Sequence, residues 1–355
     1  MEPFQTRAFG NPSSIHAAGR QARAAIDGAR AQVAALIGAT PDEVQFTSGG
    51  TEADNWALHG RHGVITSTVE HPAVLRAAEA LQEGGAKVWF VAVGPDGRLD
   101  PAVVLDTIDG AETDLVSLIL ANNETGTLQP LAEIGSALRQ RRIPFHIDAV
   151  QACGKVPVDV EMLGADLLSL SAHKINGPKG VGALYVRHGT MLSPLMHGGG
   201  HAQGLRAGTE NVAGIVGFGA AAALRLQELE ADALQLMVLR DRLRAGLMAA
   251  IDDVVLNGCQ AHCLPGTLNL SFRRIESESI LVGLDMEGIA VSGGSACAAG
   301  SAVPSHVLLA MGMEPRLAAG AVRFSLGYGN DAAQVDRVIE VLPPIVARLR
   351  ALSVY

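Results

Sequence analysis

Lys174 is the residue of this chain whose type and setting point most directly to chemistry. It stands behind Ser171 and His173 in a polar loop between two apolar, strand-like runs, residues 166–170 and 181–186. Glycines after the lysine exclude a continuing helix. A lysine held between buried strands loses solvation, which lowers its pKa and makes the amine nucleophilic. The pattern favours a Schiff-base lysine, although an ordinary loop lysine would show the same short motif.

A Schiff-base lysine needs a carbonyl cofactor, and pyridoxal phosphate makes three demands on its protein. It needs a cradle for its phosphate, an acid for its pyridine nitrogen and a group stacked on its ring. The chain contains candidates for each demand. They are Gly50, Thr51, Ser171 and His173 for the phosphate, Asp148 for the pyridine nitrogen, His71 for the ring face, and Asn123 and Gln151 for the phenolic oxygen.

The phosphate candidates begin at a glycine turn, residues 48–52. A short strand, Val44–Thr47, runs into Ser-Gly-Gly-Thr-Glu ahead of a helical segment. The backbone N–H groups of a helix N-terminus therefore open on the turn and can bind phosphate. The turn matches neither the G-x-G-x-x-G nor the Walker A pattern, which disfavours a dinucleotide site. A capping box at Thr51 is compatible with the same residues.

The elements around these residues alternate between strands and helices, which predicts an α/β fold with a mostly parallel sheet. In such sheets ligands bind beyond the carboxyl ends of the strands. Each polar group at a strand end could cap a turn by itself, but five such ends in succession predict one shared site. The groups are residues 48–51, 70–71 and 122–124, Asp148 with Gln151, and residues 171–174. The expected strands are Val44–Thr47, Val64–Ser67, Lys87–Val93, Leu115–Ala121 and Pro144–Asp148, with helices at His16–Ile37 and from Pro72, Asp100 and Pro130.

The length of 355 residues suits one large and one small domain. We expect a boundary near Glu230, with a large cofactor-binding domain at residues 1–230 and a smaller C-terminal α+β domain at residues 231–355. Two long helical segments should bridge them, followed by two half-buried strands and a closing amphipathic helix. These elements are Val212–Leu229, Asp232–Ile251, Thr267–Phe272, Ala321–Leu326 and Ala332–Leu352.

Composition restricts the class of partner. Hydrophobic residues make up 48% of the chain and charged residues 18%, and the formal net charge is −9. No basic cluster is long enough to follow a phosphate backbone, so we expect small-molecule ligands rather than nucleic acid or an anionic membrane. The most apolar stretch, Val212–Leu224, is too short to span a bilayer, and the N-terminus does not resemble a signal peptide. We therefore expect a cytoplasmic protein.

Four cysteines occur in the chain: Cys153, Cys259, Cys263 and Cys297. They form no C-x-x-C pair and are too few for a disulfide framework. Residues 259–263 lack a second pair of ligands at zinc-like spacing, so no metal site is predicted. Cys297 differs, because Gly293, Gly294 and Gly300 surround it. A thiol that collects a sulfur atom and hands it on needs such exposure and freedom to move.

Several of these stretches also form a set of motifs that covers nearly the whole chain. The motifs are residues 9–14, 47–52, 70–71, 122–126, 146–151, 171–174, 198–201 with 206–209, and 292–301 with 304–306. Together they resemble the cysteine desulfurases, which are fold-type I pyridoxal-phosphate enzymes. The last motif, with Gly-Ser-Ala-Cys at 294–297, is similar to the family's loop for the sulfur-accepting cysteine. It resembles the longer-loop subgroup that supplies iron–sulfur cluster assembly.

The resemblance implies a fold-type I transferase that converts L-cysteine to L-alanine and leaves a persulfide on Cys297. Lys174 would hold pyridoxal phosphate, and His71 would shuttle protons. Asn123 and Arg323 would grip the carboxylate of the substrate.

The resemblance also implies protein partners. Thr209 would reach the phosphate bound by a neighbouring subunit, which makes a homodimer the functional state. The sulfur atom would pass to an acceptor protein, either an iron–sulfur scaffold or a sulfur carrier.

One departure from the family leaves other functions open. Family members usually begin with a segment resembling Leu-Asp-Asn-Ala-Ala-Thr-Thr-Pro, which contributes to the floor of the substrate cleft, whereas this sequence begins Met1-Glu-Pro-Phe. The cofactor candidates are complete without that segment, so one alternative is an inactive assembly partner that still binds the cofactor. A selenocysteine lyase is another alternative, because it would share the Lys174 site.

Overall fold

The structure, a computed structural model, describes residues 1–199, 204–293 and 304–352. The chain divides into two compact units. The first unit comprises Met1–Val91, Pro101–Leu120 and Pro130–Leu229, and the second comprises Ala92–Asp100, Ala121–Gln129 and Glu230–Tyr355. The main division falls between Leu229 and Glu230. Two short segments within residues 1–230 belong to the second unit.

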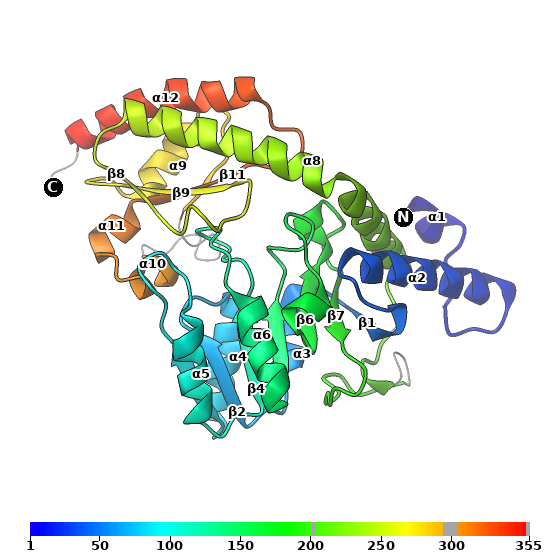
Figure 1. The fold of residues 1–355 in the computed structure, drawn as a ribbon. Helices are drawn as coiled ribbons and strands as arrows, with labels where there is room; N and C mark the ends of the chain where they lie inside the picture. The colour runs from blue at the N-terminus through cyan, green and yellow to red at the C-terminus, as the bar shows by residue number, and fades with distance from the viewer. Residues whose placement is uncertain (200–203, 294–303, 353–355) are drawn as a thin grey trace. The chain divides into compact units, whose positions relative to one another are not determined.

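The first unit is built on a sheet that has seven strands within the described residues (Figure 1). They are β1 (Val44–Thr47), β2 (Gly63–Ser67), β3 (Lys87–Val91), β4 (Leu115–Ile119), β5 (Phe145–Asp148), β6 (Leu167–Ser171) and β7 (Gly182–Val186). Their order is β1-β7-β6-β5-β4-β2-β3. All neighbours from β3 to β6 are parallel, and β7 runs antiparallel to both β6 and β1. The predicted α/β class with a mostly parallel sheet is confirmed.

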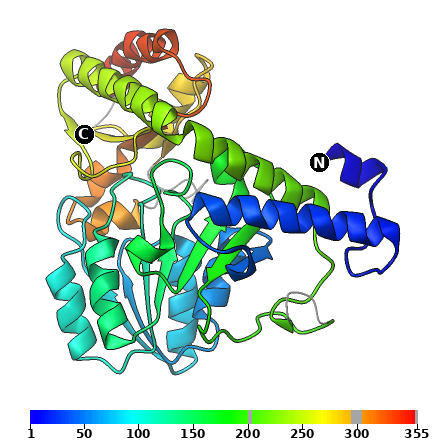
Figure 2. The ribbon, with the colours of Figure 1, turned by 45° about the vertical axis from the view of Figure 1, so that its right-hand side comes forward.

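Helices surround this sheet, and every residue of β2, β4 and β6 is buried, as expected of parallel strands between helical layers. The helices are α1 (Glu2–Thr6), α2 (Ala17–Leu36), α3 (Gly50–Leu58), α4 (Pro72–Glu83), α5 (Pro101–Asp109), α6 (Leu131–Arg141), α7 (Val160–Leu163) and the first part of α8 (Val212–Ala250). Figures 1 and 2 show α2 beside the start of α8. Gly219 permits this packing, because a Cβ there would lie 2.6 Å from the Cα of Ala29.

One tryptophan fixes α3 against the sheet. Trp56 is fully buried and packs in a cluster that includes Leu115 of β4 and Leu167 of β6. Its indole N–H donates to the carbonyl oxygen of Ser193 at 2.9 Å, so the buried polar atom is satisfied. The N-terminus of α3 is therefore held at a defined place above the sheet.

The strand directions bring the predicted polar groups of the first unit to one edge. Because β1, β2, β5 and β6 run the same way, their carboxyl ends lie together and carry residues 48–51, 70–71, 148–151 and 171–174. The fifth group, residues 122–124, follows β4 in sequence but belongs to the second unit.

The second unit has a four-stranded sheet among its described residues, antiparallel throughout, in the order β10-β11-β9-β8. Its strands are β8 (Val254–Leu256), β9 (Thr267–Phe272), β10 (Ser292–Gly293) and β11 (Ala321–Ser325), and its helices are the rest of α8, α9 (Ser277–Asp285), α10 (His306–Ala310), α11 (Pro315–Ala319) and α12 (Ala332–Leu352). Its core joins Leu243 of α8, Leu270 of β9 and Leu342 of α12. The second unit thus combines an antiparallel sheet with helices.

Helix α8 differs from the sequence expectation. The two predicted helical segments form one helix of 39 residues, because residues 229–232 contain neither glycine nor proline to interrupt it. Of the helices in the described part of the chain, α8 is long and apolar enough to cross a membrane by length and composition, a property that it shares with the core helices of soluble proteins. Phe218 and Leu243 of this helix are core residues.

A side chain at Gly182 should disturb the glycine turn. A Cβ on this residue of β7 would lie 2.5 Å from the carbonyl oxygen of Leu170 and 2.7 Å from the Cα of Gly49. Gly182→Ala should therefore lower the free energy of unfolding by about 1–3 kcal/mol, the usual cost of overpacking. Chemical denaturation measures this change.

Gly28 provides the matched control. It lies in α2, and a Cβ there would have nothing within 4 Å. Gly28→Ala should be neutral or should raise the free energy of unfolding by up to about 1 kcal/mol, because alanine favours the helix. Equal losses in the two variants would contradict the close approach at Gly182.

Candidate active site

The glycine turn opens α3 at the carboxyl end of β1. The helix begins at Gly50, with Gly49 as its N-cap and no hydrogen bond from a capping side chain. The capping box considered at Thr51 therefore does not form. The N–H groups of the first turn carry the partial positive charge of the helix dipole, which favours an anion beside them.

A hollow of about 390 Å³ lies at this turn. Its lining includes Gly50, Thr51, Ser171 and His173, the four predicted phosphate candidates. The Oγ of Ser171 lies 2.9 Å from Nδ1 of His173, and Lys179 adds a positive charge to the lining. The structure thus gathers donors suited to a phosphate, and their binding role stays a prediction. The remaining lining residues are Ser48, Gly49, Glu52 and Gly180.

Lys174 lies in a short 3-10 turn, Ala172–Ile175, between the paired strands β6 and β7. It is half-buried rather than fully desolvated. Its charge acts on Asp148, which ends β5, is 3% exposed and accepts the N–H of Val150 at 2.9 Å. Burial raises the pKa of Asp148 to about 6, while the Val150 N–H and the Lys174 charge act to lower it. The predicted nucleophile and the predicted pyridine partner therefore lie together.

Two further carboxyl groups are buried behind Asp148. Burial raises the pKa of Asp54 on α3 well above its usual range, and the charge of Asp148 adds to this effect. Burial likewise raises the pKa of Glu70 to about 8, with a contribution from Asp148. At neutral pH, Glu70 therefore keeps its proton, and the negative charge lies on Asp148.

A buried histidine fixes the strand that bears Asp148. The Nδ1 of His146 lies 2.8 Å from Oγ of Ser117 on β4, and its Nε2 lies 2.9 Å from Oγ of Ser169 on β6. Burial, with help from the charge of Arg61, lowers the pKa of His146 to about 3. The imidazole is thus neutral and links three strands. The sequence pattern indicates no role for His146, although a spacing of two residues puts His146 and Asp148 on one face of the strand.

His71 and Gln151 also lie at strand ends of the first unit. His71 is the N-cap of α4, and its Nδ1 accepts the N–H of Ala73 at 3.1 Å. The Oε1 of Gln151 accepts a hydrogen bond from Nζ of Lys155 at 2.7 Å. Ring stacking by His71 and contact of Gln151 with a phenolic oxygen stay predictions.

Asn123 and Arg323 meet in the second unit. Nη1 of Arg323, on β11, donates to the carbonyl oxygen of Asn123 at 2.6 Å. Glu124 follows Asn123 and accepts a hydrogen bond from Oγ of Ser305. Burial raises the pKa of Glu124 to about 7, while the Ser305 bond and the Arg323 charge act to lower it. The side-chain oxygen of Asn123 is buried and has no hydrogen-bond partner in the described residues, which suits an acceptor kept for a ligand.

Thr209 is exposed in a segment that two ion pairs hold. Arg206 pairs with Glu52 at 2.9 Å, and Glu210 pairs with Arg23 at 2.9 Å. Neither pair was expected from the sequence.

Cys297, the predicted sulfur acceptor, lies outside the described residues. The described cysteines are free thiols, and burial raises the pKa of Cys153 to about 12, which suits a structural residue. Within residues 1–199, 204–293 and 304–352, no group of three or more His, Cys, Asp or Glu side chains is placed to hold a metal ion.

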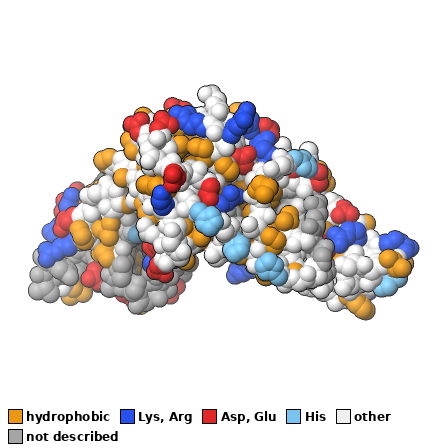
Figure 3. All heavy atoms as spheres, turned by 90° about the horizontal axis from the view of Figure 1, so that it is seen from below, with side chains coloured by type: hydrophobic (Ala, Val, Ile, Leu, Met, Phe, Trp, Pro, Cys, Tyr) orange, Lys and Arg blue, Asp and Glu red, His pale blue; other side chains and the backbone are white. Residues whose placement is uncertain are grey.

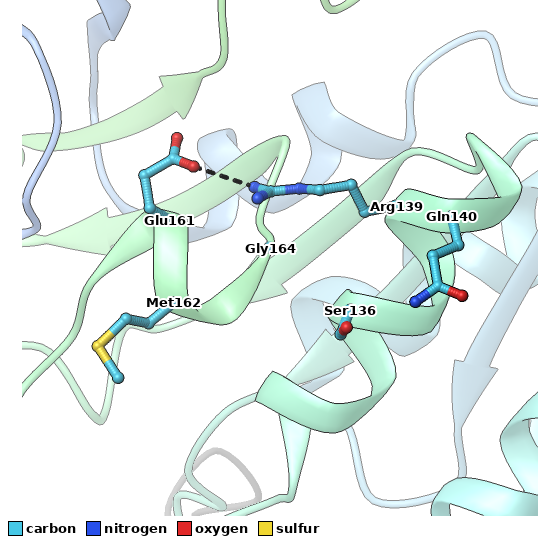
Figure 4. A pocket seen from close by; sticks show the side chains of 6 residues that line it. All are labelled: Ser136, Arg139, Gln140, Glu161, Met162 and Gly164. Carbon is cyan, nitrogen blue, oxygen red and sulfur yellow. Dashed lines mark hydrogen bonds and ion pairs between the residues drawn. The ribbon is translucent and has the colours of Figure 1, made fainter.

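A second hollow, of about 520 Å³, lies between α6 and α7 (Figure 4). Arg139 and Glu161 form an ion pair across it at 3.3 Å, and Met162 points away from them. Its charged pair is already satisfied, so the larger hollow lacks the chemistry of the glycine turn. On the face in Figure 3, basic and acidic side chains are interspersed over the described residues, with no large patch of one sign.

Comparison with known proteins relates the chain to one family. Residues 1–338 match the family described as Aminotransferase class-V. The chain is 48% identical to a cysteine desulfurase of Nostoc sp. (strain PCC 7120), over 99% of this chain and 89% of the relative. It is 45% identical to the cysteine desulfurase IscS of Dictyoglomus turgidum, over 100% and 92%.

Solved structures agree with this relation. A NifS-like protein matches with a TM-score of 0.91 and 37% identity, over 98% of this chain and 94% of that protein. SspA in complex with cysteine matches with a TM-score of 0.79 and 34% identity, over 92% and 93%.

Glu70 should make stability depend on pH. Its pKa is about 8 in the folded protein against a usual 4.5, so the folded state keeps a proton that the unfolded chain releases. This contribution is fully present below about pH 4.5 and is lost as pH rises through about 8, at roughly 1.4 kcal/mol per pH unit. Glu70→Gln mimics the protonated acid, so it should match the wild type at pH 5 and be more stable at pH 8. Denaturant unfolding at both pH values measures this.

Glu83→Gln, at an exposed site in α4, serves as the control and should follow the wild type. The same pH dependence in Glu70→Gln and in the wild type would show that Glu70 is ionised in the folded protein.

Proposed function

The chain belongs to the cysteine desulfurases of the class-V aminotransferase family, and from this premise we propose the residues that convert L-cysteine to L-alanine. The enzyme depends on pyridoxal phosphate. The observation that carries our assignment is the pairing, at adjacent strand ends of the first unit, of the half-buried Lys174 with the buried carboxylate of Asp148. A nucleophilic amine and an acid for the pyridine nitrogen are the two groups that this cofactor needs most.

The first unit also fits the cofactor's phosphate. Gly49 and Gly50 leave no side chain over the start of α3, so the backbone N–H groups of its first turn, with Thr51, Ser171 and His173, form a donor set for a phosphate. When bound, pyridoxal phosphate supplies an aldehyde for amines and a ring that draws electrons from the bonds of the substrate. Lys174 holds the cofactor, and Asp148 keeps its ring nitrogen positive.

The second unit supplies groups for the substrate. Arg323 is half-buried, and its Nη1 donates to the carbonyl oxygen of Asn123. A guanidinium of this kind is suited to hold a carboxylate. The buried side-chain oxygen of Asn123 is an acceptor for an amine or a hydroxyl. His71, at the start of α4, is the group that moves protons on the substrate.

Cys297 receives the sulfur. Its thiolate bonds to the sulfur atom of L-cysteine while the C–S bond breaks, and the carbon takes up a proton to give L-alanine. One thiol and L-cysteine thus become one persulfide and L-alanine, with atoms balanced and no external oxidant. The terminal sulfur then passes to a thiol of an acceptor protein, for iron–sulfur cluster assembly or another sulfur-transfer route.

Two substitutions separate the parts of this assignment. Lys174→Ala should lose both the visible absorption of the bound cofactor and the formation of alanine, because the amine that holds the cofactor is gone. Cys297→Ser should keep the visible band, and the band should still shift on addition of L-cysteine. No alanine should form, because a hydroxyl is a poor nucleophile toward sulfur and stores no persulfide.

Alanine release at the wild-type rate from Cys297→Ser would mean that another group accepts the sulfur. A wild type that binds the cofactor but yields no alanine from L-cysteine would favour the inactive assembly partner. Colourless wild-type protein after incubation with pyridoxal phosphate would refute the assignment of Lys174.

A homodimer completes the proposal. Thr209 is exposed and its segment is held by ion pairs on both sides, so its hydroxyl is presented outward to a partner's site. Phe9 and Ile15, 77% and 92% exposed, are apolar surface of the kind that a second copy covers.

Sedimentation should therefore give twice the mass of one chain. Thr209→Ala should stay dimeric but bind pyridoxal phosphate roughly fivefold to tenfold more weakly, the cost of about one hydrogen bond. A fully active monomer would contradict the composite site.

A further inference from the structure

Glu52 shapes the glycine turn from within the first turn of α3. Its Oε2 accepts the N–H of Ser48 at 2.8 Å, so the carboxylate folds back over the start of the helix and fixes residues 48–52. Burial acts to raise the pKa of Glu52, but hydrogen bonds from Arg206 and Ser48 outweigh this effect and leave the pKa below its usual range. The carboxylate is therefore ionised.

An ionised carboxylate at the glycine turn should repel an anionic ligand. Glu52 lines the same hollow as Gly50, Thr51, Ser171 and His173, the groups proposed for the phosphate. A phosphate monoester carries close to two negative charges at neutral pH. Like charges a few ångströms apart in a partly buried site repel strongly, so the residue that shapes the turn should also oppose its ligand.

Arg206 removes this conflict. Its Nε and Nη2 donate to Oε1 and Oε2 of Glu52 at 2.9 and 3.2 Å, a two-point pairing that cancels the carboxylate charge. Both side chains are mostly buried, 21% and 12% exposed, so solvent screens the pair little. Arg206 does not line the hollow in the described residues, so it acts through Glu52 rather than on a ligand.

We propose that Arg206 is a positioning and charge-balancing residue of the phosphate site: by pairing with Glu52 it lets a carboxylate shape a turn that binds a dianion. The inference rests on the proposed function, since it concerns the phosphate of pyridoxal phosphate. It adds a residue to the site that contacts neither the cofactor nor the substrate.

Substitution of Arg206 and substitution of Glu52 should change the affinity for pyridoxal phosphate in opposite directions. Arg206→Gln keeps a donor near Glu52 but leaves the carboxylate charge uncancelled, so pyridoxal phosphate should bind about tenfold or more weakly. Glu52→Gln removes the charge, and its amide oxygen can still accept the Ser48 N–H. This variant should bind pyridoxal phosphate as well as the wild type or more tightly. The double variant should recover to within about threefold of the wild type.

Titration of pyridoxal phosphate into each variant, after removal of bound cofactor, gives the dissociation constants from the visible absorbance. Pyridoxal, which lacks the phosphate, is titrated in parallel, and its affinity should be the same in all variants. Arg187→Gln is the matched control. Arg187 is 22% exposed and pairs with Glu161, away from the glycine turn, so the variant should bind pyridoxal phosphate like the wild type.

The affinities distinguish a charge-balancing role of Arg206 from a purely structural one. If the double variant binds as weakly as Arg206→Gln, or if Arg206→Gln weakens pyridoxal equally, the pair is a structural clasp and the charge-balancing role is wrong. Unchanged phosphate-dependent affinity in Arg206→Gln overturns it as well. A wild type that binds no pyridoxal phosphate overturns the proposed function instead, so the two failures are distinguishable.

Discussion

The first unit depends on how it accommodates three buried carboxyl groups, those of Asp54, Glu70 and Asp148, together with the ammonium group of Lys174. Burial without a partner makes a charge costly, and Lys174 is the cation that acts on Asp148. Asp54 and Glu70 lie in the same buried region, where burial raises the pKa of each carboxyl group. His146 stays neutral for the same reason. Asp148 and Lys174 thus supply the two charges that the chemistry of the cofactor requires.

The charges at the glycine turn are balanced as well. Glu52 is useful there for its geometry, because its carboxylate reaches back to the N–H of Ser48. Its charge is unwelcome beside a phosphate, and Arg206 cancels it. A site for an anion is therefore made by N–H groups, hydroxyls and the charge of Lys179, while the carboxylate of Glu52 in its lining is paired with Arg206.

Much of this arrangement follows from local patterns in the sequence. The apolar runs give β1 with its predicted bounds, and the alternation of strands and helices predicts where Asp148 and Lys174 lie, because both depend on short-range periodicity. The sequence pattern does not predict the features that depend on tertiary contacts. Gly49, rather than Thr51, is next to the helix start, and the role of His146 depends on Ser117 and Ser169 from two other strands. The pairing of Glu52 with Arg206 spans most of the first unit in sequence, so no local signal could reveal it.

The division of the chain into units has a consequence for its synthesis. Ala92–Asp100 and Ala121–Gln129 belong to the second unit, although they leave the ribosome more than one hundred residues before Glu230 does. They carry buried groups, among them Leu99 and Glu124, that have no completed core to enter at that time. The first unit is therefore not one continuous stretch of chain, and two of the segments within it reach their own unit only after the residues from Glu230 onward have been made.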